Sequence, residues 1–265
     1  MQKRVTALKR KAHLGVKHRS EFDNIYHCCV QRTASQWLRN IYNDEVFYRN
    51  TGLRAIPYKE MGLAGAHIDE PFPKRTIVTH LYISYPTYVS IPKPPAHRYF
   101  FVQRDPRDAV VSWYYAARYS HKPMGSIPEM RRDLSSMSQE DGIHYMIDAI
   151  NARGYFDALR SWTEVEPSDS FRIFRYEDIA LDLRGFLGNL FNFLKIPALP
   201  AELDSLAERK SFQQASGGRQ QGEEDIHAHL RKGTPGDWRT ALNDSALDHL
   251  RRVSGDLVEV LGYET

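Results

Sequence analysis

Cysteine is nearly absent from this 265-residue chain, which holds only Cys28 and Cys29. These two neighbours fall in an apolar run that predicts a strand, where adjacent side chains point to opposite faces and are poorly placed to pair. The sequence therefore excludes a disulfide framework and favours a reducing location, so we expect a cytoplasmic protein. Buried strand cysteines are the better interpretation, with a catalytic thiol as the alternative.

Long hydrophobic runs are also missing. No apolar run approaches the roughly 20 residues of a membrane-spanning helix, so we expect no transmembrane segment. Residues 1–22 are rich in lysine and arginine and have no apolar core long enough for a signal peptide. We expect a solvated basic lead-in there, and contact with an anionic membrane or polymer is the alternative.

The chain shows no internal repeat, low-complexity tract or interdomain linker, so a single domain over residues 1–265 is the economical prediction. Its net charge of +3 is too small to single out a nucleic-acid partner. His227 and His229 lie close together in sequence, but no convergent cysteine or acidic ligands accompany them. We therefore expect no metal site.

Strand-like and helix-like segments alternate along the chain. Apolar, β-branched or aromatic runs predict strands at residues 24–30, 75–83, 97–103 and 170–178. Apolar periodicity or end signals predict helices at residues 35–49, from 106 onward, and at 139–163, 183–196 and 245–261. Loops are predicted at residues 125–138 and 216–230, the latter glycine-rich at its start and mobile. This order predicts an α/β domain with a central, mostly parallel sheet flanked by helices.

Polar residues follow three of the predicted strands, where an open parallel sheet binds its ligands. The first group spans Arg32 to Gln36, the second is Arg104 with Asp105, and the third is Tyr176 with Glu177. Three strand ends that line one crevice are a stronger indication of a site than any one of them alone.

The first of these loops, in "HCCVQRTASQW", has the strand–loop–helix layout of a phosphate cradle but contains neither glycine nor lysine. Arg32 supplies a positive charge, and backbone N–H groups around residues 34–37 would point at an anion on the helix dipole. A simple capped helix start is the alternative interpretation.

Two further clusters carry cations. Arg104 at a strand end and Ser112 in the next helix are spaced to grip one phosphate, unless Arg104 instead pairs with Asp108. Near the C-terminus, "RKGTPGDW" places Arg231 and Lys232 before a glycine, which suits a terminal phosphate.

Five segments together carry a family resemblance: "VQRTASQWL", "VTHL", "VQRDPRDAVVSWYY", "FRYED" and "RKGTPGDW". In order and approximate spacing they resemble the signature segments of cytosolic sulfotransferases that use 3′-phosphoadenosine 5′-phosphosulfate (PAPS), from about residue 27 to residue 240. The resemblance implies a P-loop-like fold and transfer of a sulfuryl group from PAPS to an acceptor hydroxyl or amine. Adenosine 3′,5′-bisphosphate would be the product.

The resemblance also implies individual roles. The residues at the 5′-phosphosulfate would be Arg32, in place of the family's lysine, with the wrapping loop Thr33, Ala34, Ser35 and Gln36. Those at the adenine would be Trp37, Tyr176, Ser211 and Phe212. Those at the 3′-phosphate would be Arg104, Ser112, Arg231, Lys232 and Gly233. His80 matches the general base, and with Arg32 it would carry the chemistry.

Besides Arg32, three positions depart from the family pattern: Ala34 replaces a glycine, Gln36 a threonine and Val78 a lysine. Arg32 therefore has to supply more of the positive charge at the sulfuryl group. Its guanidinium is bulkier and less mobile than an ammonium.

The residues also leave two other functions open. A nucleotide-dependent small-molecule kinase is weakened by the missing GxxxxGK[ST] motif. A non-catalytic binder of nucleic acid or another anionic polymer is weakened because aromatic and basic residues are not interleaved along a stripe. Oligomeric state is not determined.

The acceptor pocket is predicted from residues 54–72, 82–97 and 118–140. Its walls would be aromatic and moderately apolar: Tyr82, Tyr85, Tyr88, Tyr119 and Met124. Such walls suit a small-molecule, lipid or carbohydrate acceptor.

Overall fold

A computed structural model describes residues 15–57 and 68–264. Five parallel strands form one sheet in the order β2-β3-β1-β4-β5. The strands are β1 (Asn24–Cys29), β2 (Arg54–Pro57), β3 (Thr76–Tyr82), β4 (His97–Gln103) and β5 (Phe171–Arg175). β1 lies at the centre and is buried along its whole length, as its apolar sequence predicts.

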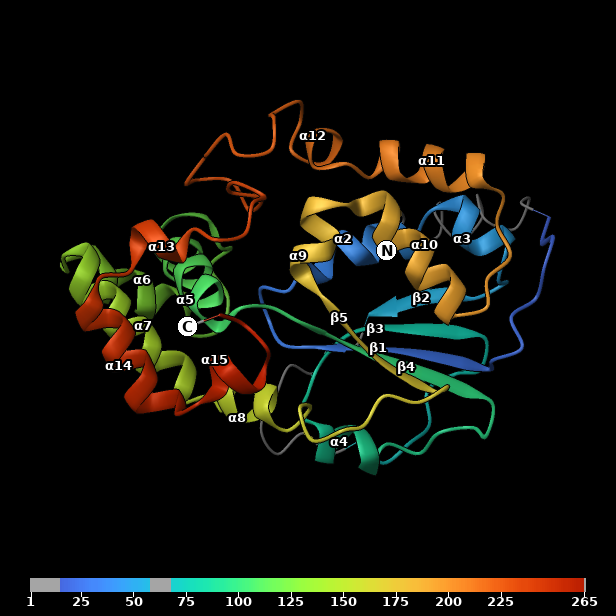
Figure 1. Ribbon diagram of the computed structural model, residues 1–265, viewed down its shortest axis with the longest axis horizontal. Coiled ribbons are helices and arrows are strands. Elements are labelled where there is room, and N and C mark those ends of the chain that lie inside the picture. The colour runs from blue at the N-terminus through green and yellow to red at the C-terminus, as the bar shows by residue number, and fades with distance from the viewer. Residues whose placement is uncertain (1–14, 58–67, 265) are drawn as a thin grey trace.

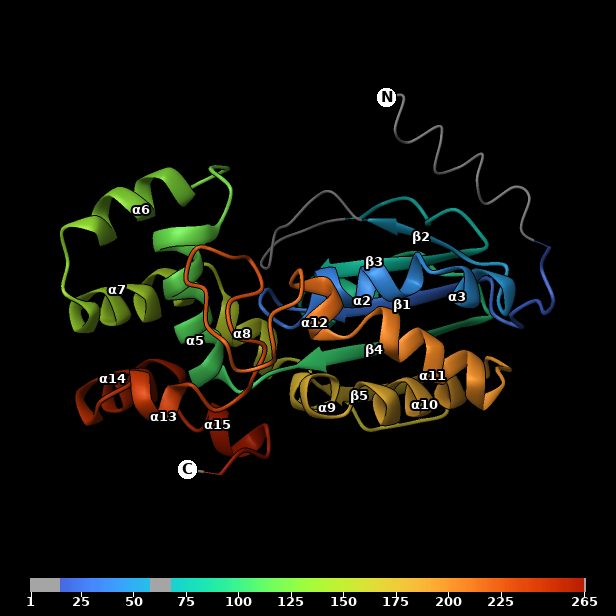
Figure 2. The ribbon, with the colours of Figure 1, turned by 90° about the horizontal axis from the view of Figure 1, so that it is seen from above.

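Helices cover the sheet and extend beyond it (Figure 1). Those placed along the sheet are α2 (Ser35–Tyr42), α3 (Glu45–Arg49), α4 (Tyr85–Ser90), α9 (Tyr176–Leu181), α10 (Leu183–Phe193), α11 (Pro200–Arg209) and α12 (Phe212–Ala215). Those gathered beyond the strand ends are α5 (Pro106–Tyr115), the π-helix η1 (Ala116–Ser120), α6 (Ile127–Ser135), α7 (Gln139–Asn151), α8 (Tyr155–Arg160), α13 (Trp238–Ala241), α14 (Asp244–Ser254) and α15 (Leu257–Val260). The arrowheads of β3 and β4 point toward this second group (Figure 2), so the carboxyl ends of the strands face it.

The pairing of β1 with β3 contains a bulge. Tyr26 pairs with Val78, but Cys28 pairs with Leu81, so β3 carries one extra residue between these pairs. His80 lies in this interval and adopts a left-handed backbone with φ 43°. A bulge bends the strand and changes the direction of a side chain, and in β3 the residue at the bulge is His80.

The predicted α/β class, the parallel sheet and four of the strands are confirmed. Asp105 caps α5, because its side chain accepts a hydrogen bond from the Arg107 N–H. Both cysteines are buried and unpaired. The strand predicted at 170–178 is shorter, because Tyr176 begins α9.

Several helix predictions are wrong. The loop predicted at 125–138 contains α6, which buries Ile127, Met130 and Leu134 on one face. The helix predicted at 35–49 is two helices, because the Asp44 side chain accepts from the Val46 N–H and starts α3. The helices predicted at 139–163 and 245–261 are broken at Gly154 and Gly255, both at positive φ.

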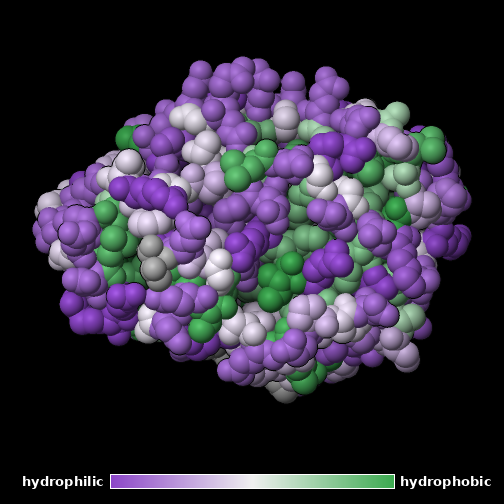
Figure 3. Space-filling model, in the orientation of Figure 1, coloured by the Kyte–Doolittle hydropathy of each residue, from purple (hydrophilic) through white to green (hydrophobic). Residues whose placement is uncertain are grey.

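The face of the molecule seen in Figure 3 is mostly hydrophilic, with smaller apolar areas scattered over it. Within the described ranges, every helix is too short or too polar to cross a lipid bilayer.

Candidate functional site

The loop after β1 turns without glycine. Arg32 and Ala34 both take left-handed backbone conformations, at φ 70° and 59°. The Thr33 hydroxyl donates to the Val30 carbonyl at 2.7 Å, and the Ala34 carbonyl accepts from the Leu38 N–H at 2.9 Å to start α2. For a residue other than glycine, this left-handed backbone conformation costs about 1–2 kcal/mol relative to the right-handed one. This loop therefore keeps the tight shape that a glycine at position 34 would adopt without strain.

Three separate elements bind this loop from outside. The Arg32 Nε donates to the Ser112 hydroxyl of α5 at 2.9 Å. The Arg104 Nη1, at the end of β4, donates to the Arg32 carbonyl at 3.0 Å. The Tyr155 hydroxyl of α8 donates to the Gln31 carbonyl at 2.9 Å. The predicted first and second clusters thus form one site at the carboxyl ends of β1 and β4.

Arg32 and Arg104 together make this site strongly positive. Burial and the neighbouring charge of Arg104 lower the pKa of the Arg32 guanidinium to about 10, so it stays protonated at neutral pH. Arg104 is 6% exposed, and its guanidinium carbon lies 4.0 Å from the ring centroid of Tyr176. Its Nε has no hydrogen-bond partner among the described residues. Two cations this close favour an anionic ligand.

The alternative partner of Arg104, Asp108, is engaged elsewhere. Its carboxylate lies 4.0 Å from Arg104 Nη2, at the outer limit of an ion pair. The same carboxylate accepts the N–H groups of Gly236 at 2.6 Å and Trp238 at 3.0 Å. Asp108 therefore serves mainly to dock the segment after the third cluster onto α5.

His80 lies within β3 at the bulge and is 6% exposed. Its Nδ1 has no partner within the part of the chain that the structure describes. Burial and the nearby charge of Arg39 lower the pKa of the imidazole to about 4. His80 is therefore neutral at neutral pH and keeps a lone pair that can accept a proton.

Tyr82 connects the end of β3 to the first loop. Its ring lies 5.2 Å from that of His80, and its hydroxyl shares a hydrogen bond with Ser35 at 2.7 Å. The same strand end thus carries both His80 and a contact to the anion-binding loop.

The residues predicted at the adenine come from α2, from α9, which Tyr176 begins, and from the start of α12. Trp37, on α2, donates its Nε1–H to the Lys210 carbonyl at the end of α11. Ser211 caps α12 by accepting from the Gln214 N–H. Phe212 packs so closely on Gly233 that a Cβ at Gly233 would lie 2.3 Å from the ring. This position, at φ 76°, therefore requires glycine.

The cations of the third cluster are held by carboxylates. Lys232 Nζ lies 2.6 Å from Asp237 Oδ1, and Arg231 pairs with both Asp237 and Glu224. The Arg231 guanidinium also lies 4.4 Å from the ring centroid of Tyr115 on α5. The structure thus brings this cluster to α5, the helix that also carries Ser112.

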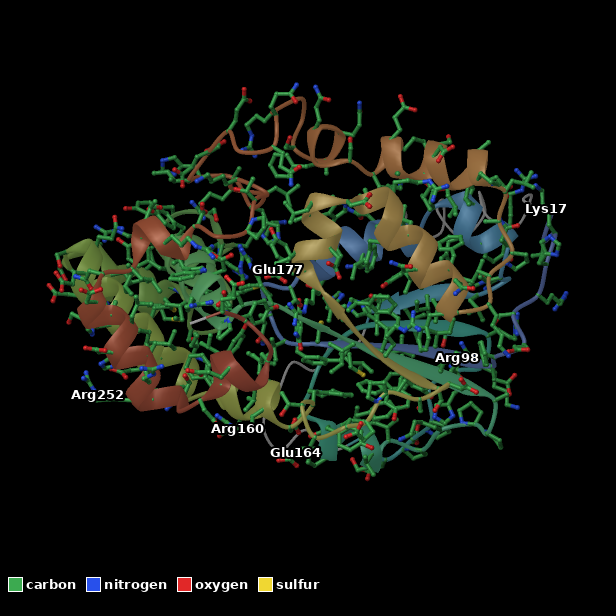
Figure 4. All side chains as sticks on the ribbon, viewed as in Figure 1. Lys17, Arg98, Arg160, Glu164, Glu177 and Arg252 are labelled. Carbon is green, nitrogen blue, oxygen red and sulfur yellow. The ribbon has the colours of Figure 1, made fainter. Side chains whose placement is uncertain are left out.

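Sequence reasoning missed several residues of the site. Tyr155 has no motif around it, and only the tertiary structure places its hydroxyl on the first loop. Glu177 was noted only as a strand-end residue, yet it accepts from the Asp105 N–H at 3.2 Å and from the Tyr263 hydroxyl at 3.0 Å, which joins the ends of β4 and β5. Figure 4 shows Glu177 where α9 approaches the helices beyond the sheet.

The residues predicted as acceptor walls lie in different surroundings. Tyr82 lies beside His80, and the Tyr119 ring contacts both Arg118 and His227. Tyr88 was wrong as a pocket wall, because it is 2% exposed and stacks on Tyr99 at 4.3 Å in the core. Residues 58–67 of the predicted pocket lie outside the described residues.

Comparison with known proteins identifies the family. A model described as the sulfotransferase domain matches residues 5–262. Sulfotransferase 2B1 of Mus musculus is 24% identical over 92% of this chain and 74% of its own length. Amine sulfotransferase of Oryctolagus cuniculus is 22% identical over 87% of this chain and 79% of its own length.

Solved structures share the fold. Mouse sulfotransferase SULT7A1 complexed with PAP has a TM-score of 0.59 at 16% identity, covering 91% of this chain and 85% of the other. Retinol dehydratase in a complex with retinol and PAP has a TM-score of 0.53 at 20% identity, covering 98% and 87%. With the domain match across nearly the whole sequence, the chain belongs to the sulfotransferase family and is an enzyme of that class.

Proposed function

We propose that this enzyme transfers the sulfuryl group of PAPS to a hydroxyl or amine of its acceptor, with His80 as general base, and releases adenosine 3′,5′-bisphosphate. The observation that carries the proposal is the meeting of Arg32, Arg104 and Ser112 at the carboxyl ends of β1 and β4. Such a pair of guanidinium groups, with a tight loop and a helix N-terminus beside it, suits a ligand with two phosphate groups.

In this proposal, the two phosphate-bearing ends of the donor are held by different residues. Arg32 and the loop Thr33, Ala34, Ser35 and Gln36 would hold the 5′-phosphosulfate. Arg104 and Ser112 would hold the 3′-phosphate, together with Arg231, Lys232 and Gly233. Trp37, Tyr176, Ser211 and Phe212 would surround the adenine, and the packing of Phe212 on Gly233 supports this grouping.

The chemistry would be an in-line displacement at sulfur. The acceptor oxygen or nitrogen forms the new bond to sulfur while the bond from sulfur to the phosphate oxygen breaks. The acceptor proton passes to the neutral imidazole of His80, and the electron pair stays on the leaving bisphosphate, which Arg32 stabilises. The low pKa of His80 in the free protein rises beside a bound anion, because a negative neighbour favours the imidazolium.

Calorimetry and transfer assays test this proposal. Adenosine 3′,5′-bisphosphate is expected to raise the melting temperature, and no shift at millimolar ligand would contradict PAPS as donor. His80→Ala is expected to lower kcat at least 100-fold while bisphosphate affinity stays within about twofold, since proton transfer contributes 10²–10⁴-fold. His144→Ala, on α7, is the matched control and is expected to leave both unchanged. Full turnover by His80→Ala would remove His80 from the mechanism.

The acceptor is proposed only by class. Retinol dehydratase has been solved in complexes with androsterone and with retinol, and one relative is an amine sulfotransferase. A small-molecule, lipid or carbohydrate hydroxyl, or an amine, is the corresponding proposal for this chain. A PAPS-dependent screen of phenols, sterols, glycolipids, oligosaccharides and amines separates these classes.

A further inference from the structure

A buried carboxylate joins two parts of the predicted adenine site that are far apart in sequence. Asp44 lies between α2 and α3, and its side chain is 6% exposed. It binds Arg209 at 2.8 Å and Lys210 at 3.0 Å, the last residue of α11 and the one that follows it. It also accepts the Val46 N–H at 3.1 Å. Asp44 thus has a local partner and two distant ones.

The residues that Asp44 holds are neighbours of the predicted adenine contacts. The Lys210 carbonyl accepts the indole N–H of Trp37, so this residue touches both Asp44 and the predicted stacking ring. The next two residues are Ser211 and Phe212, which begin α12. Phe212 in turn packs on Gly233. A continuous set of contacts therefore runs from Asp44 to three segments of the proposed site.

The electrostatics favour a charged, oriented Asp44. Burial alone would raise the pKa of this carboxyl, but hydrogen bonds from Arg209, Lys210 and the Val46 N–H outweigh it and lower the pKa. A carboxylate that accepts from two cations on adjacent residues fixes the direction of the backbone between them. The end of α11 is held in this way against α2.

We propose that Asp44 is a positioning residue for the nucleotide, acting through Lys210 on Trp37 and Phe212. This inference rests on the proposed function. Asp44 would not touch the donor itself, and it would set the spacing of the two aromatic side chains that flank the adenine. Its loss should therefore weaken binding of the nucleotide through the base rather than through the phosphates.

Asp44→Asn tests this role, because an asparagine oxygen can still accept the Val46 N–H and start α3. We expect the Kd for adenosine 3′,5′-bisphosphate to rise about tenfold, as loss of charged hydrogen bonds predicts. The Kd for ribose 3,5-bisphosphate, which lacks the base, should change less than twofold. The KM for PAPS should rise with kcat nearly unchanged.

Asp204→Asn is the matched control. Asp204 also lies on α11 and pairs with an arginine, Arg184, but this pair is exposed. We expect both bisphosphates to bind it as they bind the wild type. Lys210→Met, which keeps Arg209, is expected to give an intermediate loss for the nucleotide alone.

The outcomes separate the two proposals. Unchanged nucleotide affinity in Asp44→Asn, or an equal loss for both bisphosphates, would overturn the positioning role while leaving the proposed function in place. Wild-type protein that binds no adenosine 3′,5′-bisphosphate would instead contradict the proposed function, and the positioning role with it. A tenfold loss confined to the adenine-bearing ligand supports both.

Discussion

Two pairs of cations in this protein, Arg32 with Arg104 and Arg231 with Lys232, have different kinds of partner. Arg32 and Arg104 contact a hydroxyl, a carbonyl and an aromatic ring. The Asp108 carboxylate lies 4.0 Å from Arg104, and it accepts hydrogen bonds from two backbone N–H groups. Arg231 and Lys232 are paired directly with Asp237, and Arg231 also with Glu224.

This difference separates cations without a carboxylate partner at short range from cations that are already paired. Buried cations that are held by neutral groups retain a net positive charge that an anion can neutralise. Cations that already share a buried carboxylate contribute mainly to docking their loop, and a phosphate has to compete with that carboxylate for them. We therefore expect substitutions of Arg32 and Arg104 to act on binding, and loss of the Asp237 carboxylate to act on stability.

Arg104→Ala is expected to show the largest effect. It removes a guanidinium from the proposed phosphate site and the bond to the Arg32 carbonyl. The Kd for adenosine 3′,5′-bisphosphate should rise about 100-fold or more, as for loss of a charge-assisted contact. Isothermal titration calorimetry measures it. Arg132→Ala, an exposed arginine on α6, is the control, and equal affinities for the two variants would remove the distinction between the clusters.

Asp237→Asn tests the third cluster, Arg231 and Lys232. Asp237 is 7% exposed, and the substitution leaves Arg231 and Lys232 without their shared charge partner. We expect the free energy of unfolding to fall by about 2 kcal/mol, because breaking a buried pair strands its cations. Glu224→Gln, at a more exposed carboxylate, should cost less than about 0.5 kcal/mol. Urea unfolding compares them, and equal stabilities would show that Asp237 is not a structural anchor.

His80 gives the smallest expected effect, through pH. The folded-state pKa, about 4, lies below the ordinary value of 6.5, so protonation disfavours the folded state. Stability is unaffected above pH 6.5 and is lost as pH falls from 6.5 toward 4. After solvent screening we expect a loss on the order of 1–2 kcal/mol. His80→Gln should flatten this part of the profile relative to wild type, and two parallel profiles would show that His80 is not the group responsible.

The strands and the order of the site segments could be predicted from the sequence because they depend on local patterns. Val, Ile and aromatic runs indicated β1, β3 and β4, and Asp105 followed by Pro106 indicated the start of α5. Helix boundaries were harder to predict. The break at Asp44 depends on a cap, and its two cationic partners come from 165 and 166 residues away.

The sequence by itself determined the class of fold, the family and the residue types at each strand end, since periodicity and short motifs are local properties of the chain. The tertiary structure decided which of those residues meet. It placed Tyr155 on the first loop, turned His80 at a bulge and gave Arg231 and Lys232 carboxylate partners. These features depend on burial and on contacts between distant segments, and only folding creates them.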